Sequence, residues 1–295
     1  MEELLLIDLG SSSVKAYTYN KPNLKLACTK SIPFKEGFSE KGISEINKTD
    51  LLNFLRKLKS KHPKVKFCVY ATAVFRKLSP IVLKSLVDGI QKVGDIEFRL
   101  ISPEEESEFL ELALVGKYPT NEPILLINIG GGSTELVIVN RDSSNHYNID
   151  LGVGSIISEF SNINETYSSV TLSRVIEFVT PKLPEIKEKV KIAFYTGGEL
   201  TYMSLASYTL SKNKLFEDSD HPSIIQTNNF AKRNEEIFSQ VTLNELESLM
   251  NDNPQWMHGA RACSAFAQAI CNKYEIETII PSNSNLINGV IRKLF

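Results

Sequence analysis

The sequence predicts an α/β protein of two domains, and an internal repeat is the observation that predicts it most directly. Residues 4–20 read LLLIDLGSSSVKAYTYN and residues 124–140 read ILLINIGGGSTELVIVN, with a constant offset of 120 and no gap. In each copy an apolar run predicts a buried strand, a Gly/Ser tetrad predicts a turn, and a second apolar stretch predicts the returning strand. A length of 295 residues with 42% hydrophobic content is sufficient for two packed cores.

The residues between and beyond the two repeats alternate strand and helix patterns, as α/β domains require. The clearest helix pattern lies in residues 50–58, where four leucines share one helical face. Helices are expected over residues 50–58, 80–93, 104–115, 199–206, 242–250 and 260–273, and strands over 65–70, 96–101, 192–195 and 276–280. The polar residues 212–233 are expected to form a surface loop. The predicted domains are 1–119, completed by the C-terminal residues 286–295, and 120–285.

Composition and charge exclude some classes of protein. The formal net charge is -2, which gives no electrostatic reason to expect nucleic acid as the main partner. The N-terminus is acidic and its apolar run is short, and no apolar run approaches the length of a transmembrane helix, so neither a signal peptide nor a membrane partner is expected. The four cysteines form no close pair. Free thiols in a cytoplasmic protein are therefore expected.

The two Gly/Ser turns are candidate anion sites. Their backbone N–H groups lack bulky neighbours and can converge on an anion, and their hydroxyls add donors. Asp8 and Asn128 occupy the same position of the repeat, just before each turn. One such hairpin is usually only a hairpin, but two related domains facing each other across a cleft would hold a phosphate chain from both sides. This pattern resembles the actin-like (ribonuclease H-like) ATPase and sugar kinase superfamily.

Three adjacent carboxylates mark the start of the helix expected at residues 104–115. The helix dipole favours acidic residues there, which accounts well for Glu104 and Glu105. A third carboxylate, Glu106, could serve as a general base for a water molecule if it faces the cleft. The four histidines are scattered without zinc-ligand spacing, so solvent-facing or locally bonded roles are expected for them.

Six motifs, in order along nearly the whole chain, resemble the exopolyphosphatase / guanosine pentaphosphate phosphohydrolase family. The most specific contains GGGSTE, at residues 130–135. The motifs are IDLGSSS (7–13), YATAVFRKL (70–78), ISPEEES (101–107), INIGGGSTELVI (127–138), DLGVGS (150–155) and TGGELTYMSLA (196–206). The length fits the short members of the family, which lack a further C-terminal helical domain.

The resemblance implies a role for each matching residue. Glu106 would deprotonate a water that attacks the terminal phosphoryl group of polyphosphate or guanosine pentaphosphate, and Arg76 would neutralise charge on that group. Mg²⁺, or another divalent cation, would be held by Asp8, Glu135 and Asn128. A homodimer, common for such relatives, is a possible assembly. The implied phosphate-binding residues are Gly10, Ser11, Ser12, Ser13, Thr72, Gly130, Gly131, Gly132, Ser133, Thr134, Gly197 and Gly198.

The sequence departs from the family pattern at several positions. Asn128 and Asn283 stand where aspartates are usual, and Glu199 stands where threonine is common. Ser12 replaces an asparagine, and Ile287-Asn288 replaces an Arg-Glu pair. Two alternatives to the hydrolase therefore stay open. One is a catalytically weak regulator that binds an alarmone or polyphosphate, and the other is a kinase or ATPase of the wider superfamily.

Overall fold

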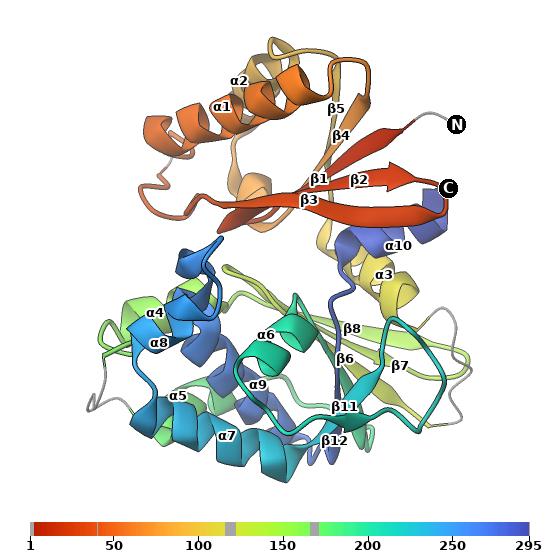
Figure 1. Ribbon diagram of the computed structural model, residues 1–295, viewed down its shortest axis with the longest axis vertical. Coiled ribbons are helices and arrows are strands. Elements are labelled where there is room, and N and C mark those ends of the chain that lie inside the picture. Colours follow the sequence, from red (N-terminus) through yellow and green to blue (C-terminus); the bar gives the residue numbers. More distant parts are fainter. Residues whose placement is uncertain (1–2, 40, 116–121, 166–170, 295) are drawn as a thin grey trace. The chain divides into compact units, whose positions relative to one another are not determined.

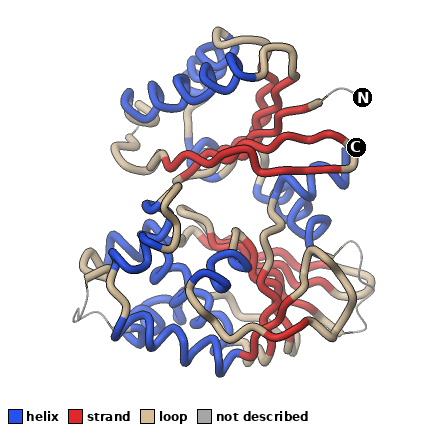
Figure 2. Tube along the Cα trace, viewed as in Figure 1, coloured by secondary structure: helices blue, strands red, loops and turns tan. Residues whose placement is uncertain are grey.

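A computed structural model describes residues 3–39, 41–115, 122–165 and 171–294. The chain falls into two compact units, Met1–Glu106 and Ser107–Phe295. Each unit contains one β-sheet with helices packed against it (Figures 1 and 2). The predicted α/β fold class with two sheets is confirmed.

The first unit is built on a five-stranded sheet in the order β3-β2-β1-β4-β5. Strands β1, β2 and β3 are antiparallel neighbours, whereas β4 pairs with β1, and β5 with β4, in parallel. Its elements are β1 (Leu4–Leu9), β2 (Ser13–Asn20), β3 (Asn23–Ser31), α1 (Glu45–Lys61), β4 (Lys66–Ala71), the 3-10 helix η1 (Ala73–Lys77), α2 (Pro80–Gln91) and β5 (Ile96–Leu100).

One face of this sheet forms the core of the first unit. The alternate residues Leu5, Ile7 and Leu9 of β1 are fully buried on that face, where α1 and α2 lie side by side (Figure 1). Leu51 and Leu55 of α1 supply part of the apolar stripe that covers it. Because side chains alternate along a strand, Asp8 points to the opposite face of the sheet.

The second unit is built on a seven-stranded sheet in the order β10-β11-β12-β9-β6-β7-β8. The chain enters it through α3, which begins at the end of the first unit. Its elements are α3 (Pro103–Leu114), β6 (Ile124–Ile129), β7 (Thr134–Val139), β8 (Ser144–Ile149), α4 (Val153–Glu159), α5 (Leu172–Val179), the 3-10 helix η2 (Thr180–Lys182), β9 (Ile192–Thr196), α6 (Glu199–Leu205), β10 (Ser211–Lys212), β11 (Ser223–Gln226), α7 (Thr227–Gln240), α8 (Leu243–Ser248), the 3-10 helix η3 (Pro254–Gly259), α9 (Ala260–Lys273), β12 (Thr278–Pro281) and α10 (Leu286–Leu294).

Helices cover both faces of this second sheet. The larger core joins alternate residues of β6, such as Leu125 and Ile127, to α5, α7 and α9, which gather on one side (Figure 1). The smaller core joins Leu126 to Leu110 and Leu114 of α3 on the other face. Residues of α10 pack on α3 so closely that a Cβ on Gly289 would lie 1.8 Å from the carbonyl oxygen of Phe109.

The sequence repeat is also a repeat of sheet geometry. In β1 and β2, Leu4 pairs with Tyr19, and the pairing runs to Leu9 with Val14. In β6 and β7 the residues 120 positions later pair identically, from Ile124 with Val139 to Ile129 with Thr134. A third antiparallel strand flanks each hairpin on one side, and a parallel strand flanks it on the other. The two Gly/Ser loops therefore connect equivalent strands at equivalent positions of two related sheets.

Most predicted elements are present within a few residues of their expected bounds, but one prediction is wrong. Residues 212–233 are not a surface loop, because they contain β11 and the first half of α7. Ile225 and Phe230 in this stretch are fully buried. Polar residues on the outer side of α7 concealed the helical spacing of its apolar residues. The predicted domain boundary at residues 119–120 lies outside the described residues and stays a prediction, as does the assignment of 286–295 to the first domain.

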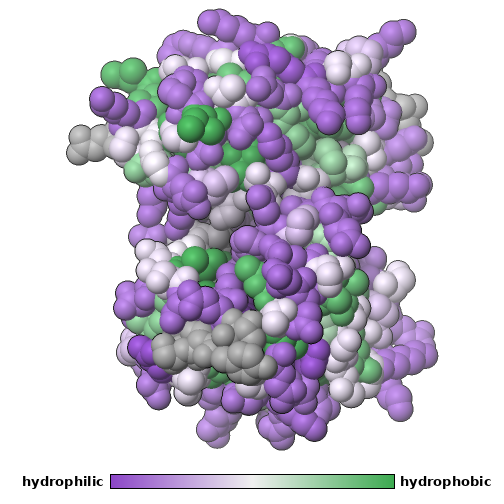
Figure 3. Space-filling view, turned by 60° about the vertical axis from the view of Figure 1, so that its left-hand side comes forward, coloured by the Kyte–Doolittle hydropathy of each residue, from purple (hydrophilic) through white to green (hydrophobic). Residues whose placement is uncertain are grey.

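The described surface is largely polar. Figure 3 shows mostly hydrophilic residues on the visible face, with hydrophobic residues in small groups. Among the described residues no helix combines the length and the apolar character that crossing a membrane requires. All four cysteines are free, with Cys68 and Cys271 buried.

Candidate functional site

The Gly/Ser loop of the first unit is fixed by neighbouring backbone. The N–H of Gly10 donates to the carbonyl of Ser13 at 3.1 Å, which closes the turn between β1 and β2. The Ser11 carbonyl accepts from Phe34, and the Ser12 carbonyl accepts from Ile32. Ser11 itself is buried, and its hydroxyl accepts from the N–H of Val74 at 3.4 Å. The loop is thus held by hydrogen bonds from neighbouring segments, and Ser12 is exposed on it.

Thr72 and Arg76 are brought next to this loop by the parallel strand β4. Thr72 follows β4 directly, and its N–H donates to the Leu9 carbonyl at 3.1 Å. Its buried side chain stands immediately before η1, which carries Arg76 near its end. The sheet therefore gathers three sequence motifs of the first unit, because strands that pair in parallel end at the same edge.

The three glutamates at the start of α3 have different environments. Glu105 and Ser102 bond reciprocally, each backbone N–H donating to the other's side chain at 3.1 Å, as in a capping box. Glu105 also pairs with Arg99. Hydrogen bonds from its own backbone N–H and from Ser102 lower the pKa of the exposed Glu104. Both residues therefore serve the helix terminus.

Glu106 faces Arg76 instead. Its Oε2 accepts from Nη1 of Arg76 at 2.7 Å, and the same guanidinium nitrogen donates to the carbonyl of Ile101 at 3.1 Å. Both side chains are mostly buried, with 11% of Glu106 and 20% of Arg76 exposed. Partial burial of a charged pair strengthens its interaction and restricts its geometry. The structure thus joins the two predicted catalytic groups of the first unit.

The Gly/Ser loop of the second unit is fixed by a different neighbour. The N–H groups of Val153 and Gly154 donate to the carbonyls of Gly130 and Gly131 at 3.0 and 2.9 Å. Gly152, just before α4, lies so close that a Cβ there would stand 2.5 Å from the Gly130 oxygen. The motif at residues 150–155 therefore matters because its backbone seats the loop.

The residues beneath the two loops show how the repeats have diverged. Asp8 pairs with Lys15 across β1 and β2, and Asn128 pairs with Glu135 at the equivalent place in β6 and β7. Burial raises the pKa of the Asp8 carboxyl, while the Lys15 ammonium works against that rise. Each hairpin thus carries one carboxylate, on the first strand in one unit and on the second strand in the other.

Glu135 is enclosed by donors from its own hairpin. The amide of Asn128 donates to its Oε2 and the hydroxyl of Ser133 donates to its Oε1, both at 2.8 Å. An aspartate at position 128 would place a second negative charge against this buried carboxylate, so the neutral amide is the compatible partner when no cation is bound. Thr134 is also buried, and its hydroxyl donates to the Leu151 carbonyl, which leaves it a structural role in this geometry.

The Gly197–Gly198 turn lies beside this second loop. It follows Thr196, the β9 residue that pairs with Asn128 of β6. Both glycines have positive φ angles of 119° and 111°, which side chains rarely adopt. A ring carbon of Trp256 would lie 3.1 Å from a Cβ on Gly198. The turn therefore depends on glycine for both its conformation and its packing.

The unusual residues around this turn have structural partners. Glu199 is buried, and its Oε1 lies 3.7 Å from the thiol of Cys263 on α9. Asn283 accepts from the N–H of Thr201 in the first turn of α6 at 3.0 Å. Among the described residues no group of three or more His, Cys, Asp or Glu side chains is arranged to hold a metal ion.

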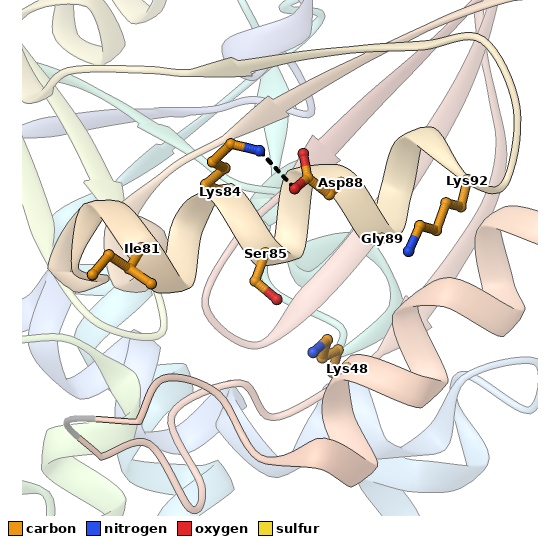
Figure 4. A pocket seen from close by; sticks show the side chains of 7 residues that line it. All are labelled: Lys48, Ile81, Lys84, Ser85, Asp88, Gly89 and Lys92. Carbon is orange, nitrogen blue, oxygen red and sulfur yellow. Dashed lines mark hydrogen bonds and ion pairs between the residues drawn. The ribbon is translucent and has the colours of Figure 1, made fainter.

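One groove of the first unit contains none of the predicted site residues. It lies between α1 and α2, has a volume of about 430 Å³, and is shown in Figure 4. Lysines contribute much of its wall, although Lys84 pairs with Asp88 at 2.8 Å. Its lining consists of Lys48, Ile81, Lys84, Ser85, Asp88, Gly89 and Lys92.

Solved structures with this fold are known. An exopolyphosphatase from Cytophaga hutchinsonii superposes with a TM-score of 0.77 at 14% sequence identity, covering 99% of this chain and 97% of that one. A Ppx/GppA family member from Aquifex aeolicus superposes with a TM-score of 0.72 at 17% identity, over 99% and 97% of the two chains. At these identities the likeness establishes the fold. No curated protein matches the sequence.

The family model for the Ppx/GppA phosphatase family matches residues 20–294. The chain therefore belongs to this family, as the six sequence motifs predicted. Membership supports a phosphatase of the type that acts on phosphoric anhydrides.

Two structural features near the predicted site residues were not expected from the sequence. Gly152 stood inside a recognised motif, but only the structure shows that its missing Cβ makes room for the second loop. His221 was expected to be solvent-facing or locally bonded. It does bond locally to Asp218, but it is completely buried and also bonds Ser282, 61 residues further along the sequence. No local pattern signals such a distant partner.

Proposed function

We propose that the protein removes the terminal phosphate of inorganic polyphosphate or guanosine pentaphosphate by hydrolysis. The observation that carries this proposal is the Glu106–Arg76 pair beside the Gly10–Ser13 loop. A carboxylate and a guanidinium on the segments next to a Gly/Ser loop are elements that can place a water against a phosphoryl group. Family membership supports phosphate hydrolysis as the reaction class, and the two substrates named are part of the proposal.

In the proposed reaction the oxygen of a water attacks the terminal phosphorus. The bridging P–O bond breaks, the shortened chain leaves with the bond electrons, and the proton of the water passes to Glu106. Glu106 is held in a fixed direction by the hydrogen bond that Nη1 of Arg76 donates to its Oε2. Its main contribution is therefore to orient the water, with proton transfer late in the reaction, as is common in phosphoryl transfer. Arg76 reduces negative charge on the transferred group.

The proposed cation is Mg²⁺, and the available donors suit it. Asp8, Asn128 and Glu135 present oxygen atoms, which Mg²⁺ prefers. Magnesium commonly uses one or two carboxylates and completes its shell with water and substrate phosphates, so a dedicated cluster of acidic residues is not needed. Bound to the carboxylate of either hairpin, the ion would neutralise phosphate charge. A nearby cation favours the charged form of the Asp8 carboxyl, which opposes the rise in its pKa that burial causes. A cytoplasmic location is proposed with this activity.

The test is phosphate release from long-chain polyphosphate with Mg²⁺, comparing wild type, Glu106→Gln and Glu104→Gln. Glutamine keeps the size and a hydrogen-bond acceptor at each position but removes the charge. We expect Glu106→Gln to lower kcat by about 10²–10⁴, and Glu104→Gln, an exposed control on the same helix turn, to act like wild type. Guanosine pentaphosphate is assayed in parallel to decide between the substrates.

The alternative of a weakly catalytic regulator is supported by Asn128, which brings no charge to a cation site. That alternative is favoured if wild type binds polyphosphate but releases no phosphate. Equal activity of Glu106→Gln and wild type would remove Glu106 from the mechanism.

A further inference from the structure

A buried hydrogen-bond chain lies behind the Gly197–Gly198 turn. His221 is completely enclosed, and its Nδ1 lies 3.0 Å from Oδ2 of Asp218, whose side chain is 4% exposed. Its Nε2 lies 2.9 Å from Oγ of Ser282. The ring packs its edge against Phe194 of β9, with centroids 4.9 Å apart. Every polar atom of the imidazole thus has a defined partner.

The bonds around Ser282 define the direction of this chain. The N–H of Ser284 donates to the Ser282 hydroxyl oxygen at 3.0 Å. The hydroxyl proton is then directed to Nε2 of His221, and the proton on Nδ1 is directed to Asp218. Burial lowers the pKa of His221, which favours this neutral form. The arrangement has the order of a hydrolytic triad, but Ser282 is completely buried and so cannot reach a substrate.

The segment that this chain fixes is the segment that holds the glycine turn. The Ser282 carbonyl accepts from the N–H of Glu199 at 3.2 Å, and Asn283 accepts from Thr201 at 3.0 Å. The hydroxyl of Thr196 donates to the Ser284 carbonyl. Residues 282–284 therefore bond the residues immediately before and after Gly197 and Gly198.

We propose that Asp218, His221 and Ser282 are positioning residues for the Gly197–Gly198 turn in its binding of phosphate. The inference rests on the proposed function, in which that turn is part of the phosphate site. His221 acts by bonding rather than by filling space. The hydrogen bonds of Asp218 and His221 fix the position of Ser282, and the Ser282 carbonyl bonds the start of α6. The two glycines are therefore held in their unusual conformation between fixed ends.

Two substitutions separate bonding from packing. His221→Gln extends an amide toward Ser282 in the place of Nε2 and keeps that bond, whereas His221→Phe keeps the ring and loses both bonds. We expect the Phe variant to raise KM for polyphosphate at least tenfold with a smaller change in kcat, and the Gln variant to lie close to wild type. His146→Gln is the matched control, because His146 also bonds a serine hydroxyl, Ser144, at 2.9 Å but on an exposed strand.

Hydrogen exchange of residues 196–201 provides a second readout that does not depend on activity. We expect faster exchange there in His221→Phe, with the exchange of α9 unchanged. Unchanged exchange at 196–201 overturns the positioning role, even if the wild type proves inactive and the proposed function fails. Faster exchange with an unchanged KM, or with unchanged tripolyphosphate binding in an inactive wild type, overturns the link to phosphate. If His221→Phe does not fold, Ser282→Ala carries the same test.

Discussion

Gly152→Ala should displace the second Gly/Ser loop without removing any functional side chain. The new Cβ would lie 2.5 Å from the Gly130 oxygen, 2.7 Å from the Gly132 nitrogen and 2.8 Å from the Gly131 carbonyl carbon. Ordinary contact begins at 3.4 Å, so backbone must move by about 0.9 Å. Every obstructing atom is backbone, which yields less easily than a flexible side chain. Forced shifts of this kind cost ~1–3 kcal/mol of stability.

The effect on activity should exceed the effect on folding. A misplacement of about 1 Å in a group that positions substrate costs ~10² in rate, so we expect kcat for phosphate release to fall by about that factor. Gly89→Ala is the control, since its new Cβ would meet only Leu52, at 3.8 and 3.9 Å. It lies in α2 and should gain ~0.5–1 kcal/mol from helix propensity. Wild-type kcat and melting temperature in Gly152→Ala would refute the argument.

Three further predictions concern stability. Burial raises the pKa of Asp8, so ionised Asp8 destabilises the fold above its folded-state pKa. Asp8→Asn should therefore raise the melting temperature at pH 7 while lowering Mg²⁺-dependent activity. A lower melting temperature would contradict this. Burial lowers the pKa of His221, so stability should be lost as the pH falls below the ordinary pKa of 6.5 toward the folded-state pKa. In urea titrations between pH 7 and 5, the free energy of unfolding of His221→Gln should therefore depend less on pH than that of the wild type. Gly289→Ala, whose Cβ would meet the Phe109 oxygen at 1.8 Å, should cost ~3 kcal/mol and speed hydrogen exchange in α3 and α10 but not in β1.

The repeat made the fold class and both loops predictable from the sequence. A constant offset with no gap preserves strand register, and the two hairpins do pair identically. The helix start accounts for Glu104 and Glu105 as expected, and the catalytic role of Glu106 stays a prediction. What the sequence did not contain was the direction of that third side chain, which depends on Arg76, 30 residues away.

The remaining features depend on contacts between distant residues. Glu199 departs from the family pattern beside the glycine turn, and the structure shows its carboxylate buried against Cys263. The helical part of residues 212–233 was missed because most of these residues are polar. The buried Phe230 is one of the few apolar residues whose spacing matches a helix, α7. The error over residues 212–233 comes from interpreting local composition where long-range packing decides the outcome.

The packing of α10 on α3 has a consequence for the order in which the protein matures. The strands and both α-helices of the first sheet have all been synthesised by residue 100, so this unit can acquire its core early. Helix α3 packs on the second sheet and gains further contacts from α10, whose Arg292 and Lys293 bond Leu112 and Glu108. Since Glu106 sits in the first turn of α3, a chain that lacks α10 carries its proposed water-orienting group on a helix with fewer contacts. A chain ended at residue 285 should therefore show faster hydrogen exchange in α3, and the proposed phosphate release should slow with it.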